Sequence, residues 1–225
     1  MRGLFVTGTD TGAGKTVLAA AIVAALRADG IRAAAFKPVV TGLDDPQDGV
    51  PADHELLGAV AGAAPDAVAP VRLGPSASPH LAAALDGVTL EPGALLEAAR
   101  RAGAEADALV VEGVGGLLVP VTLDTSVRDL ASALGLPLVV AARPGLGTIN
   151  HTLLTLEAAR TVELEVRAVV LTPWPAWPSA LERSNRETIA ALGGIEVGGL
   201  PPTALTPEAL ARAGAELRPQ RWLDR

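Results

Sequence analysis

Lys15 and Thr16 are the residues whose type and spacing most clearly indicate chemistry. They end a glycine-rich stretch at 8–16, Gly-Thr-Asp-Thr-Gly-Ala-Gly-Lys-Thr. Glycines allow tight turns that bring backbone N–H groups against phosphate oxygens, while the lysine reaches the terminal phosphates and the hydroxyl binds Mg2+. The stretch is one residue longer than the usual pattern, because Gly8 stands one place early. The sequence therefore predicts a phosphate-binding loop with an intact core at 12–16.

Strands and helices alternate along the chain, and they must position this loop. An apolar run at 4–7 predicts a strand before the loop. Further strands are expected at 31–36, 108–111, 138–142, 166–171 and 195–200. Helices are expected from 15 to about 29, from 54, over 81–85, 92–106 and 126–134, from the 145–151 loop to about 162, and over 180–192 and 207–214. Residues 39–42 are expected to lead into a loop at 42–53, and further loops are expected at 61–75 and 174–179.

The strand runs are apolar without alternation, which is typical of parallel strands buried on both faces. We therefore predict an α/β fold with a mostly parallel sheet and helices on both faces, as in phosphate-loop NTPases. No internal repeat or low-complexity linker divides the chain. We expect a single domain over residues 1–225.

The composition excludes several classes of function. The 225 residues are 49% hydrophobic and carry a formal net charge of −7, which argues against nucleic acid or an anionic membrane as partner. The chain has no cysteine, so disulfides, thiolate metal sites and a thiol-dependent glutaminase are excluded. No apolar run is long enough to span a bilayer and residues 1–7 do not resemble a signal peptide, so we expect a cytoplasmic protein.

Several polar residues stand at or just after predicted strand ends, where ligands bind in parallel α/β sheets. Lys37 follows the strand at 31–36 and is one of only two lysines, against sixteen arginines. Glu112 ends the strand at 108–111 and is interpreted either as a Mg2+ ligand or as an acid facing water. Asp53 is either a metal ligand or the N-cap of the helix that follows it. We expect these residues to converge with the 145–150 loop and Thr172 in one crevice.

Five segments together resemble the dethiobiotin synthetase family. They are the loop at 8–16, Phe-Lys-Pro-Val at 36–39, Ser-Pro-His at 78–80, Val-Glu-Gly-Val-Gly-Gly at 111–116 and Gly-Thr-Ile-Asn-His at 147–151. The resemblance implies a homodimeric cyclo-ligase of biotin biosynthesis. Such an enzyme uses Mg2+ and ATP, or another nucleoside triphosphate, to carboxylate 7,8-diaminononanoate with CO2 or bicarbonate and to close the ring of dethiobiotin.

The resemblance also implies a role for each matching position. Lys15 and Lys37 would be catalytic, and Thr16, Asp53 and Glu112 would hold the metal ion. The implied nucleotide-binding residues are Gly12, Ala13, Gly14, Lys15, Thr16, Val17, Asp53, Glu112, Gly113, Val114, Gly115, Thr172, Pro173, Leu200, Pro201 and Pro202. The implied substrate-binding residues are Thr41, Ser78, Pro79, Gly147, Thr148, Ile149 and Asn150, of which the last four would act across a dimer interface.

Three positions leave alternatives open. The pair at 172–173 is Thr-Pro, where the family commonly carries Asn-Asp to read adenine, so the preferred base is undetermined. His80 and His151 are interpreted either as helix-start or structural residues or as catalysts.

A cobyrinate-type amide ligase is a rival interpretation of the whole chain, but such an enzyme needs a glutaminase thiol, which this chain lacks. A nucleotide switch or partitioning ATPase is another, although such proteins often carry a lysine where this chain has Asp10.

Overall fold

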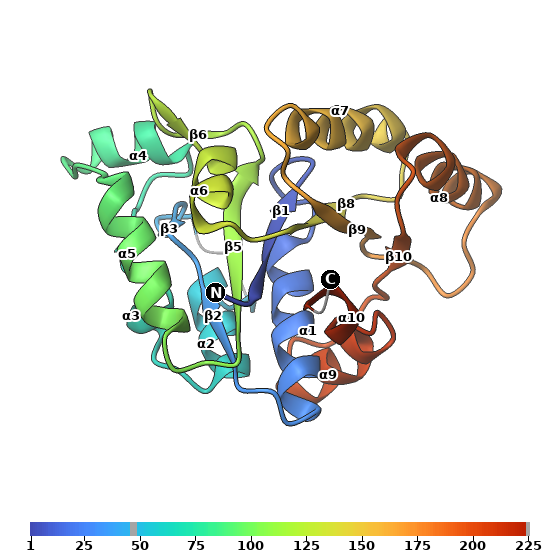
Figure 1. The fold of residues 1–225 in the computed structure, drawn as a ribbon, viewed down its shortest axis with the longest axis horizontal. Helices are drawn as coiled ribbons and strands as arrows, with labels where there is room; N and C mark the ends of the chain where they lie inside the picture. The colour runs from blue at the N-terminus through green and yellow to red at the C-terminus, as the bar shows by residue number, and fades with distance from the viewer. Residues whose placement is uncertain (46–48, 224–225) are drawn as a thin grey trace.

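The computed structural model describes residues 1–45 and 49–223. Its centre is a six-stranded parallel sheet in the order β10-β9-β8-β1-β5-β2 (Figure 1). In chain order these strands are β1 (Gly3–Gly8), β2 (Ala33–Phe36), β5 (Ala108–Gly116), β8 (Leu138–Ala142), β9 (Val166–Leu171) and β10 (Val197–Gly199). Two small sheets pair β3 (Val39–Val40) with β4 (Val71–Arg72), and β6 (Pro120–Thr122) with β7 (Thr125–Ser126). The α/β fold class predicted from the sequence is confirmed.

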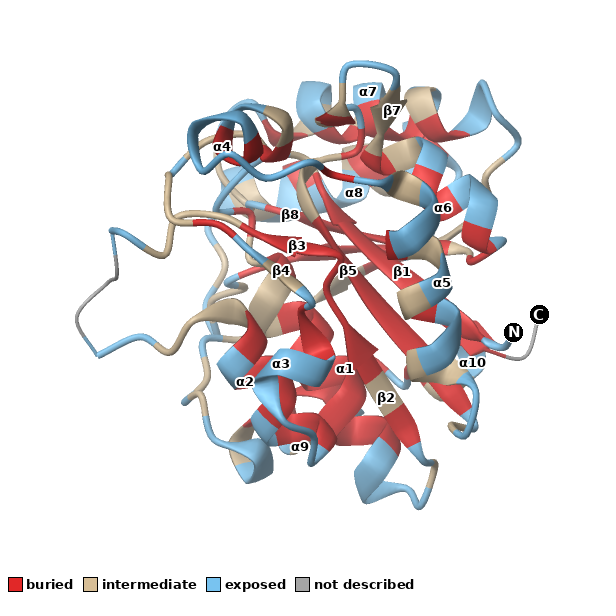
Figure 2. Cartoon of the chain, turned by 90° about the vertical axis from the view of Figure 1, so that its left-hand side faces the viewer, coloured by how far each residue is buried: buried red, intermediate tan, exposed pale blue. Residues whose placement is uncertain are grey.

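Helices cover both faces of the sheet, so its strands are buried between them (Figures 1 and 2). Leu4 and Val6 of β1 share a core with α1, α2 and α9, while the intervening Phe5 shares one with α5 and α6. A third core lies between β8, β9, α7 and α8. The helices are α1 (Lys15–Ala28), α2 (Asp53–Ala61), α3 (Pro65–Val68), α4 (Pro79–Leu85), α5 (Pro92–Gly103), α6 (Val127–Leu134), α7 (Thr148–Arg160), α8 (Ala180–Gly193), α9 (Pro207–Ala215) and α10 (Gln220–Leu223).

Small residues allow helix α1 to pack closely, and α1 carries the first residues of the predicted site. A Cβ atom built on Gly214 of α9 would lie 2.1 Å from the carbonyl oxygen of Ala21 in α1. This close approach shows how a chain with 2% aromatic residues fills its interior with alanine, valine and leucine. The packing fixes α1, and with it the loop that precedes it.

Strands at 138–142 and 166–171 and the helix beginning at 180 start where the sequence predicts them. The strand predicted at 108–111 continues through the glycines to Gly116, so Glu112 lies inside β5 rather than at its end. Short elements α3, β3, β4, β6, β7 and α10 were not predicted, and the first three fall in or just before stretches expected to be loops. Asp48, predicted in the 42–53 connection, lies outside the described residues. Among the helices described, none combines the length and apolarity needed to cross a membrane.

Candidate active site

The glycine-rich loop joins β1 to α1, and its glycines adopt conformations that other residues rarely reach. Gly12 has φ 69° and Gly14 has φ 83°, both in the left-handed region. Gly14 is also the N-cap of α1, and no side chain caps this helix. The first N–H groups of α1 are therefore free to bind an anion at the positive end of the helix dipole.

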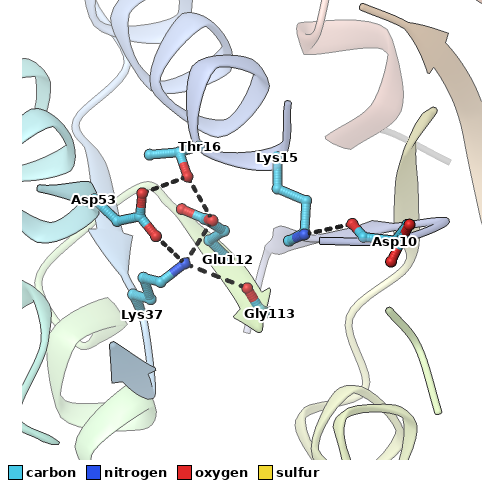
Figure 3. A network of polar contacts seen from close by, with 7 residues as sticks. All are labelled: Asp10, Lys15, Thr16, Lys37, Asp53, Glu112 and Gly113. Atoms are coloured by element: carbon cyan, nitrogen blue, oxygen red, sulfur yellow. Dashed lines mark hydrogen bonds and ion pairs between the residues drawn. The ribbon is translucent and has the colours of Figure 1, made fainter. Parts of the chain in front are cut away.

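Four side chains from four parts of the chain meet beside this loop (Figure 3). The Lys37 ammonium lies 2.6 Å from Glu112 Oε1 and 2.8 Å from Asp53 Oδ2. The Thr16 hydroxyl lies 2.8 Å from Asp53 Oδ1 and 2.9 Å from Glu112 Oε1. Because this hydroxyl has a single proton, it can donate to only one carboxylate at a time. The side chains predicted to hold a metal ion are thus brought together, with Lys37 among them.

Each of these side chains is positioned by its own element. Lys37 follows β2, and its backbone N–H donates to the Val68 carbonyl of α3. Glu112 lies on β5 between β1 and β2, in register with Val6 of β1. Asp53 is the first residue of α2, and Ala52 occupies the N-cap position, so Asp53 does not cap the helix as one interpretation of the sequence had it. Its carboxylate turns instead to Thr16 and Lys37.

Burial sets the electrostatics of the cluster. Lys37 is 3% exposed and Glu112 1%, so both groups lie in a low-dielectric environment, where burial raises the pKa of Glu112 against the attraction of Lys37. Burial disfavours the Lys37 ammonium, but the Glu112 and Asp53 carboxylates outweigh it and raise the pKa of Lys37 above its ordinary value. Burial likewise disfavours the Asp53 carboxylate, but the attraction of Lys37 outweighs it and lowers the pKa of Asp53. Lys37 and Asp53 are therefore held in their charged forms.

Lys15 stands apart from this cluster and bends back over its own loop (Figure 3). Its ammonium donates to the Asp10 carbonyl at 2.9 Å. Burial lowers the pKa of Lys15 below its ordinary value, against the opposing attraction of Glu112. Lys15 thus lies at the loop, whereas Lys37 lies among the carboxylates, and the two lysines of this chain occupy different positions in one site.

The oxygens of Thr16, Asp53 and Glu112 fit a magnesium ion. A hydroxyl and two carboxylates are the hard oxygen donors that Mg2+ prefers. Glu112 Oε2 is buried and has no hydrogen-bond partner in the structure, so this oxygen is free to coordinate a cation. Within residues 1–45 and 49–223 no group of three or more His, Cys, Asp or Glu forms a metal cage. Mg2+ commonly binds such open sites through one or two carboxylates, water and substrate phosphates.

A cavity of about 730 Å³ opens beside the cluster. Of the predicted nucleotide, substrate and catalytic residues it is lined by Gly12, Gly14, Lys15, Thr16, Val17, Lys37, Thr41, Asp53, Ser78, Pro79, Glu112, Val114 and Gly115. The Ser78 hydroxyl lies 3.0 Å from His80 Nδ1, which gives His80 a partner at the edge of this cavity. Most of the predicted site therefore converges on one volume.

The remaining predicted residues lie outside the lining of this cavity. Ala13, Gly113 and Leu200 are buried in the fold, and Thr172 is 4% exposed with its Cγ2 packed against Gly14. Pro173 and Pro202 are exposed and Pro201 is half-buried. In the segment 147–150, Thr148 is buried, Ile149 half-buried, and the other two residues are exposed, as is His151.

The prediction from sequence missed other residues at the site. Gly42, Asp45, Val50, Ser76, Ala77 and Val119 also line the cavity. Arg143 donates from Nη2 to the Thr11 carbonyl at 2.7 Å and from Nε to the Gly12 carbonyl at 3.3 Å. Arg143 directly follows the predicted strand at 138–142, so the strand-end rule that selected Lys37 would also have selected it.

A glycine-rich loop between strand and helix, a lysine and a threonine at its end, and buried carboxylates opposite define a phosphate-loop nucleoside-triphosphate-binding α/β protein. A family model described as an AAA domain matches residues 2–208. In the MinC:MinD cell division complex of Aquifex aeolicus, a chain superposes with a TM-score of 0.58 at 12% identity, over 97% of this chain and 96% of that one. That likeness concerns the fold alone.

Sequence similarity narrows the class further. The ATP-dependent dethiobiotin synthetase BioD of Anaeromyxobacter dehalogenans is 47% identical over 173 residues, which is 76% of each chain. The protein of the same name from Novosphingobium aromaticivorans is 43% identical over 226 residues, which is 96% of each chain. The chain therefore belongs to the family of ATP-dependent dethiobiotin synthetases.

Proposed function

We propose that this chain, as one domain over residues 1–225, is a dethiobiotin synthetase of biotin biosynthesis. It carboxylates 7,8-diaminononanoate with CO2 or bicarbonate, closes the ring to dethiobiotin, and converts a nucleoside triphosphate to the diphosphate and phosphate. The observation that carries the proposal is the position of Lys37. Its buried ammonium lies between Glu112 and Asp53 on the wall of the cavity that also holds the phosphate loop. Membership of the family supports it.

The reaction requires charge to be stabilised in three steps. One amine adds to CO2 and loses a proton, which gives a carbamate. A carbamate oxygen then attacks the γ-phosphorus, and the bond to the leaving diphosphate breaks. Finally the second amine attacks the carbamate carbon and loses a proton, and phosphate leaves with the electron pair of the C–O bond. Negative charge builds on the carbamate and on the phosphoryl oxygens, and fixed cations in a low-dielectric site stabilise it.

The two lysines suit different parts of this sequence. Lys15, at the end of the loop, is placed to reach the γ-phosphate by turning away from the Asp10 carbonyl. Lys37, on the other side of the cavity, is placed to hold the carbamate beside that phosphate. Thr16, Asp53 and Glu112 would hold Mg2+, which supplies further neutralisation of the phosphate oxygens when bound. Thr41, Ser78 and Pro79 line the same cavity and are proposed to contact the diamine.

The nucleotide base is assigned to the segment at 172–173 and to 200–202, beyond the phosphate loop. Pro173 has no backbone N–H, and neither residue of the 172–173 pair carries a carboxylate that could accept a hydrogen bond from adenine. Membership of the family supports ATP as the nucleotide. The Thr-Pro pair removes contacts that would select adenine, so we propose that other bases are also accepted, which kcat/KM for ATP, GTP and CTP side by side would measure.

The segment 147–150 is proposed to contact the carboxylate end of the diamine in a second copy of the chain. This is supported by its place outside the cavity of its own chain and by the exposure of the preceding Leu146, which is 91% exposed. Light scattering after size-exclusion chromatography tests the homodimer, and a monomer at every concentration would contradict it. A cytoplasmic location, tested by fractionation of cells, belongs to the same proposal.

The test of the function is an assay with diaminononanoate, bicarbonate, Mg2+ and each common nucleoside triphosphate. Dethiobiotin, detected by mass, and stoichiometric phosphate are expected. If none of the triphosphates supports dethiobiotin formation, the proposed function is wrong. Nucleotide hydrolysis without dethiobiotin, stimulated by a protein partner, would instead support a switch or partitioning ATPase. The fold likeness to the MinC:MinD chain does not favour that alternative, because it concerns the fold alone.

A further inference from the structure

Arg143, the first residue after β8, reaches across to the phosphate loop although it is 131 residues away from Gly12 in sequence. Its guanidinium donates to two consecutive loop carbonyls, at 2.7 Å to Thr11 and 3.3 Å to Gly12. Neither described partner is a carboxylate, so the contact is more than a generic surface ion pair. We propose that Arg143 is a positioning residue, which aims the backbone N–H groups of Gly12 and Ala13 at the triphosphate. The inference rests on the proposed nucleotide-dependent function.

The geometry of the peptide bond links the two sides of the loop. In a trans peptide the C=O and the following N–H lie in one plane and point in opposite directions. The Thr11 carbonyl shares a peptide unit with the N–H of Gly12, and the Gly12 carbonyl shares one with the N–H of Ala13. A guanidinium that holds both carbonyls on one side therefore directs both N–H groups to the other side. Donation to a carbonyl also polarises its peptide unit, which makes the opposite N–H a better donor.

The other side of the loop is where the phosphates belong. Thr11, Gly12 and Gly14 line the main cavity, whereas Arg143 does not. A Cβ atom on Gly12 would lie 3.0 Å from Nη2 of Arg143, and the φ of Gly12 is +69°. A side chain at position 12 would thus compete with the guanidinium for the same space. The absence of a side chain at Gly12 permits the approach of Arg143 from behind the loop.

Arg143 is itself anchored on both sides. Before it, the Thr9 N–H donates to the Ala141 carbonyl of β8 at 3.0 Å. After it, Asn185 of α8, which is 4% exposed, donates from Nδ2 to the Pro144 and Gly145 carbonyls at 2.9 and 3.1 Å. The backbone of Arg143 is therefore fixed relative to the sheet and to α8. A fixed donor can impose an orientation on the glycine-rich loop, which a mobile donor could not.

The experiment compares Arg143→Ala and Arg143→Lys with the wild type by calorimetric binding of ATP and ADP in the presence of Mg2+. Arg100→Ala is the matched control, because Arg100 is also exposed and donates to a backbone carbonyl, that of Ala133, away from the loop. Two charge-assisted hydrogen bonds are lost in Arg143→Ala, so its Kd for either nucleotide is expected to rise about tenfold. Arg143→Lys, which can reach one carbonyl, should recover part of the affinity, and Arg100→Ala should bind as the wild type does.

Salt separates positioning from simple attraction of charge. In about 1 M KCl the Debye length is about 3 Å, so long-range attraction by the Arg143 charge is screened. The ratio of the Arg143→Ala and wild-type Kd values should persist in that salt, and the rise should appear in KM more than in kcat. The proposal would be overturned if, in high salt, the Kd of Arg143→Ala differed from that of the wild type by less than twofold. It would also be overturned if Arg100→Ala lost as much nucleotide affinity as Arg143→Ala.

Two further readouts keep the test decisive. Thermal unfolding of the nucleotide-free proteins identifies a temperature at which all variants are folded. At that temperature the Kd should still increase from the wild type to Arg143→Lys and from there to Arg143→Ala. Equal Kd values for the wild type and Arg143→Ala there would contradict the inference. Binding is measured without the diamine, so failure of dethiobiotin formation with an intact Arg143 effect rejects the proposed function alone.

Discussion

On the Lys37 side of the phosphate loop, charged side chains bind one another directly at the buried wall of the cavity, whereas on the Arg143 side the contacts run through backbone carbonyls near the surface. Lys37 and Glu112 are 3% and 1% exposed and lie 2.6 Å apart. Arg143 is exposed, and its partners are peptide oxygens of the loop. The segments that follow it, at 147–150 and 172–173, line no part of the main cavity.

The difference assigns a separate physical task to each side. Buried charges interact strongly because water does not screen them, so the Lys37 side can stabilise charge that develops during a reaction. Exposed charges are screened, and a donor to backbone carbonyls acts mainly by fixing geometry. Substitutions on the first side should therefore reduce the rate of the chemical step, and those on the second should reduce the affinity for ligands.

Lys37→Met should have the largest effect. Methionine keeps a similar length without the ammonium, so kcat for dethiobiotin is expected to fall about 10²–10³-fold, as when one stabilising donor is removed from a transition state. The Kd for ATP should stay within about threefold, because Lys37 contacts the carboxylates rather than the loop. Single-turnover phosphate release and calorimetry measure the two quantities separately.

Lys15→Met is the comparison variant, since it should mainly raise the nucleotide Kd. If Lys37→Met lost as much nucleotide affinity as Lys15→Met, the distinct roles of the two lysines would be contradicted. Removing Lys37 also leaves Asp53 and Glu112 without their cation, and loss of one partner of a buried pair costs about 3–5 kcal/mol of stability. The assays therefore require a temperature at which chemical denaturation shows the variant folded.

Thr16→Val should have the next largest effect. Valine keeps the branched shape but removes the hydroxyl that lies 2.8 Å from Asp53 and 2.9 Å from Glu112. Affinity for the divalent cation in the nucleotide complex is expected to fall about tenfold, as on loss of a group at a metal site. Electron paramagnetic resonance of bound Mn2+ measures it. Thr155→Val is the control, because Thr155 only donates to the His151 carbonyl within α7, and an equal fall there would remove the metal role of Thr16.

Gly14→Ala tests the point at which the two sides of the site touch. A Cβ on Gly14 would lie 2.6 Å from Cγ2 of Thr172, and the φ of Gly14 is +83°. Nucleotide affinity is expected to fall about fivefold, because the Thr172 segment must move. Thr172→Ser removes the clashing methyl group, so the loss should be smaller in Gly14→Ala/Thr172→Ser, with a coupling of about 0.5–1 kcal/mol. If the effects of Gly14→Ala and Thr172→Ser on nucleotide affinity simply added, the loop and the Thr172 segment would be independent.

The control for backbone strain is Gly135→Ala. Gly135 has a φ of +64°, but a Cβ there meets nothing within 4 Å. Placing alanine in the left-handed region costs about 1–2 kcal/mol of stability at either position. Gly135→Ala should show that cost in thermal unfolding while its nucleotide Kd remains that of the wild type.

What could be predicted from sequence follows the same division of the molecule. The strands at 138–142 and 166–171 were predicted to the residue, because apolar runs bounded by proline, glycine or polar residues, interrupted here only by Arg167, have few alternatives. Lys37 and Glu112 were predicted as site residues because each is a charged residue at the end of a predicted strand, where ligands bind in parallel α/β sheets. Gly12 and residues 14–17, which line the cavity, followed from the spacing of the glycine-rich loop.

The rest depended on contacts between distant parts of the chain. Strand β3 pairs Val39 and Val40 with Val71 and Arg72, and a two-residue strand has no periodicity to detect. Whether Asp53 caps α2 or turns toward Lys37 could not be decided locally, because both need a carboxylate at a helix start. Arg143 stands at a strand end, as Lys37 does, but its sequence position does not show that its guanidinium reaches back to the carbonyls of the loop.

Asn185→Ala should have the smallest effect and tests the far end of the Arg143 side. Its Nδ2 donates to the Pro144 and Gly145 carbonyls, so its loss loosens the segment that leads into 147–150. Because the hydrogen bond from the Thr9 N–H to the Ala141 carbonyl still anchors Arg143 on the side of the sheet, the ATP Kd should stay within about twofold. The KM for diaminononanoate should rise about threefold, since a single hydrogen-bonding group with a net value of about 0.5–1.5 kcal/mol is removed. Asn185→Asp, which lacks the donor and turns a carboxylate toward the same two carbonyl oxygens, should raise this KM at least as much. A rise in the ATP Kd of Asn185→Ala without a rise in the KM for the diamine would give the opposite result. The segment after Arg143 would then serve the phosphate loop alone, and the proposed contact of 147–150 with substrate would have to be abandoned.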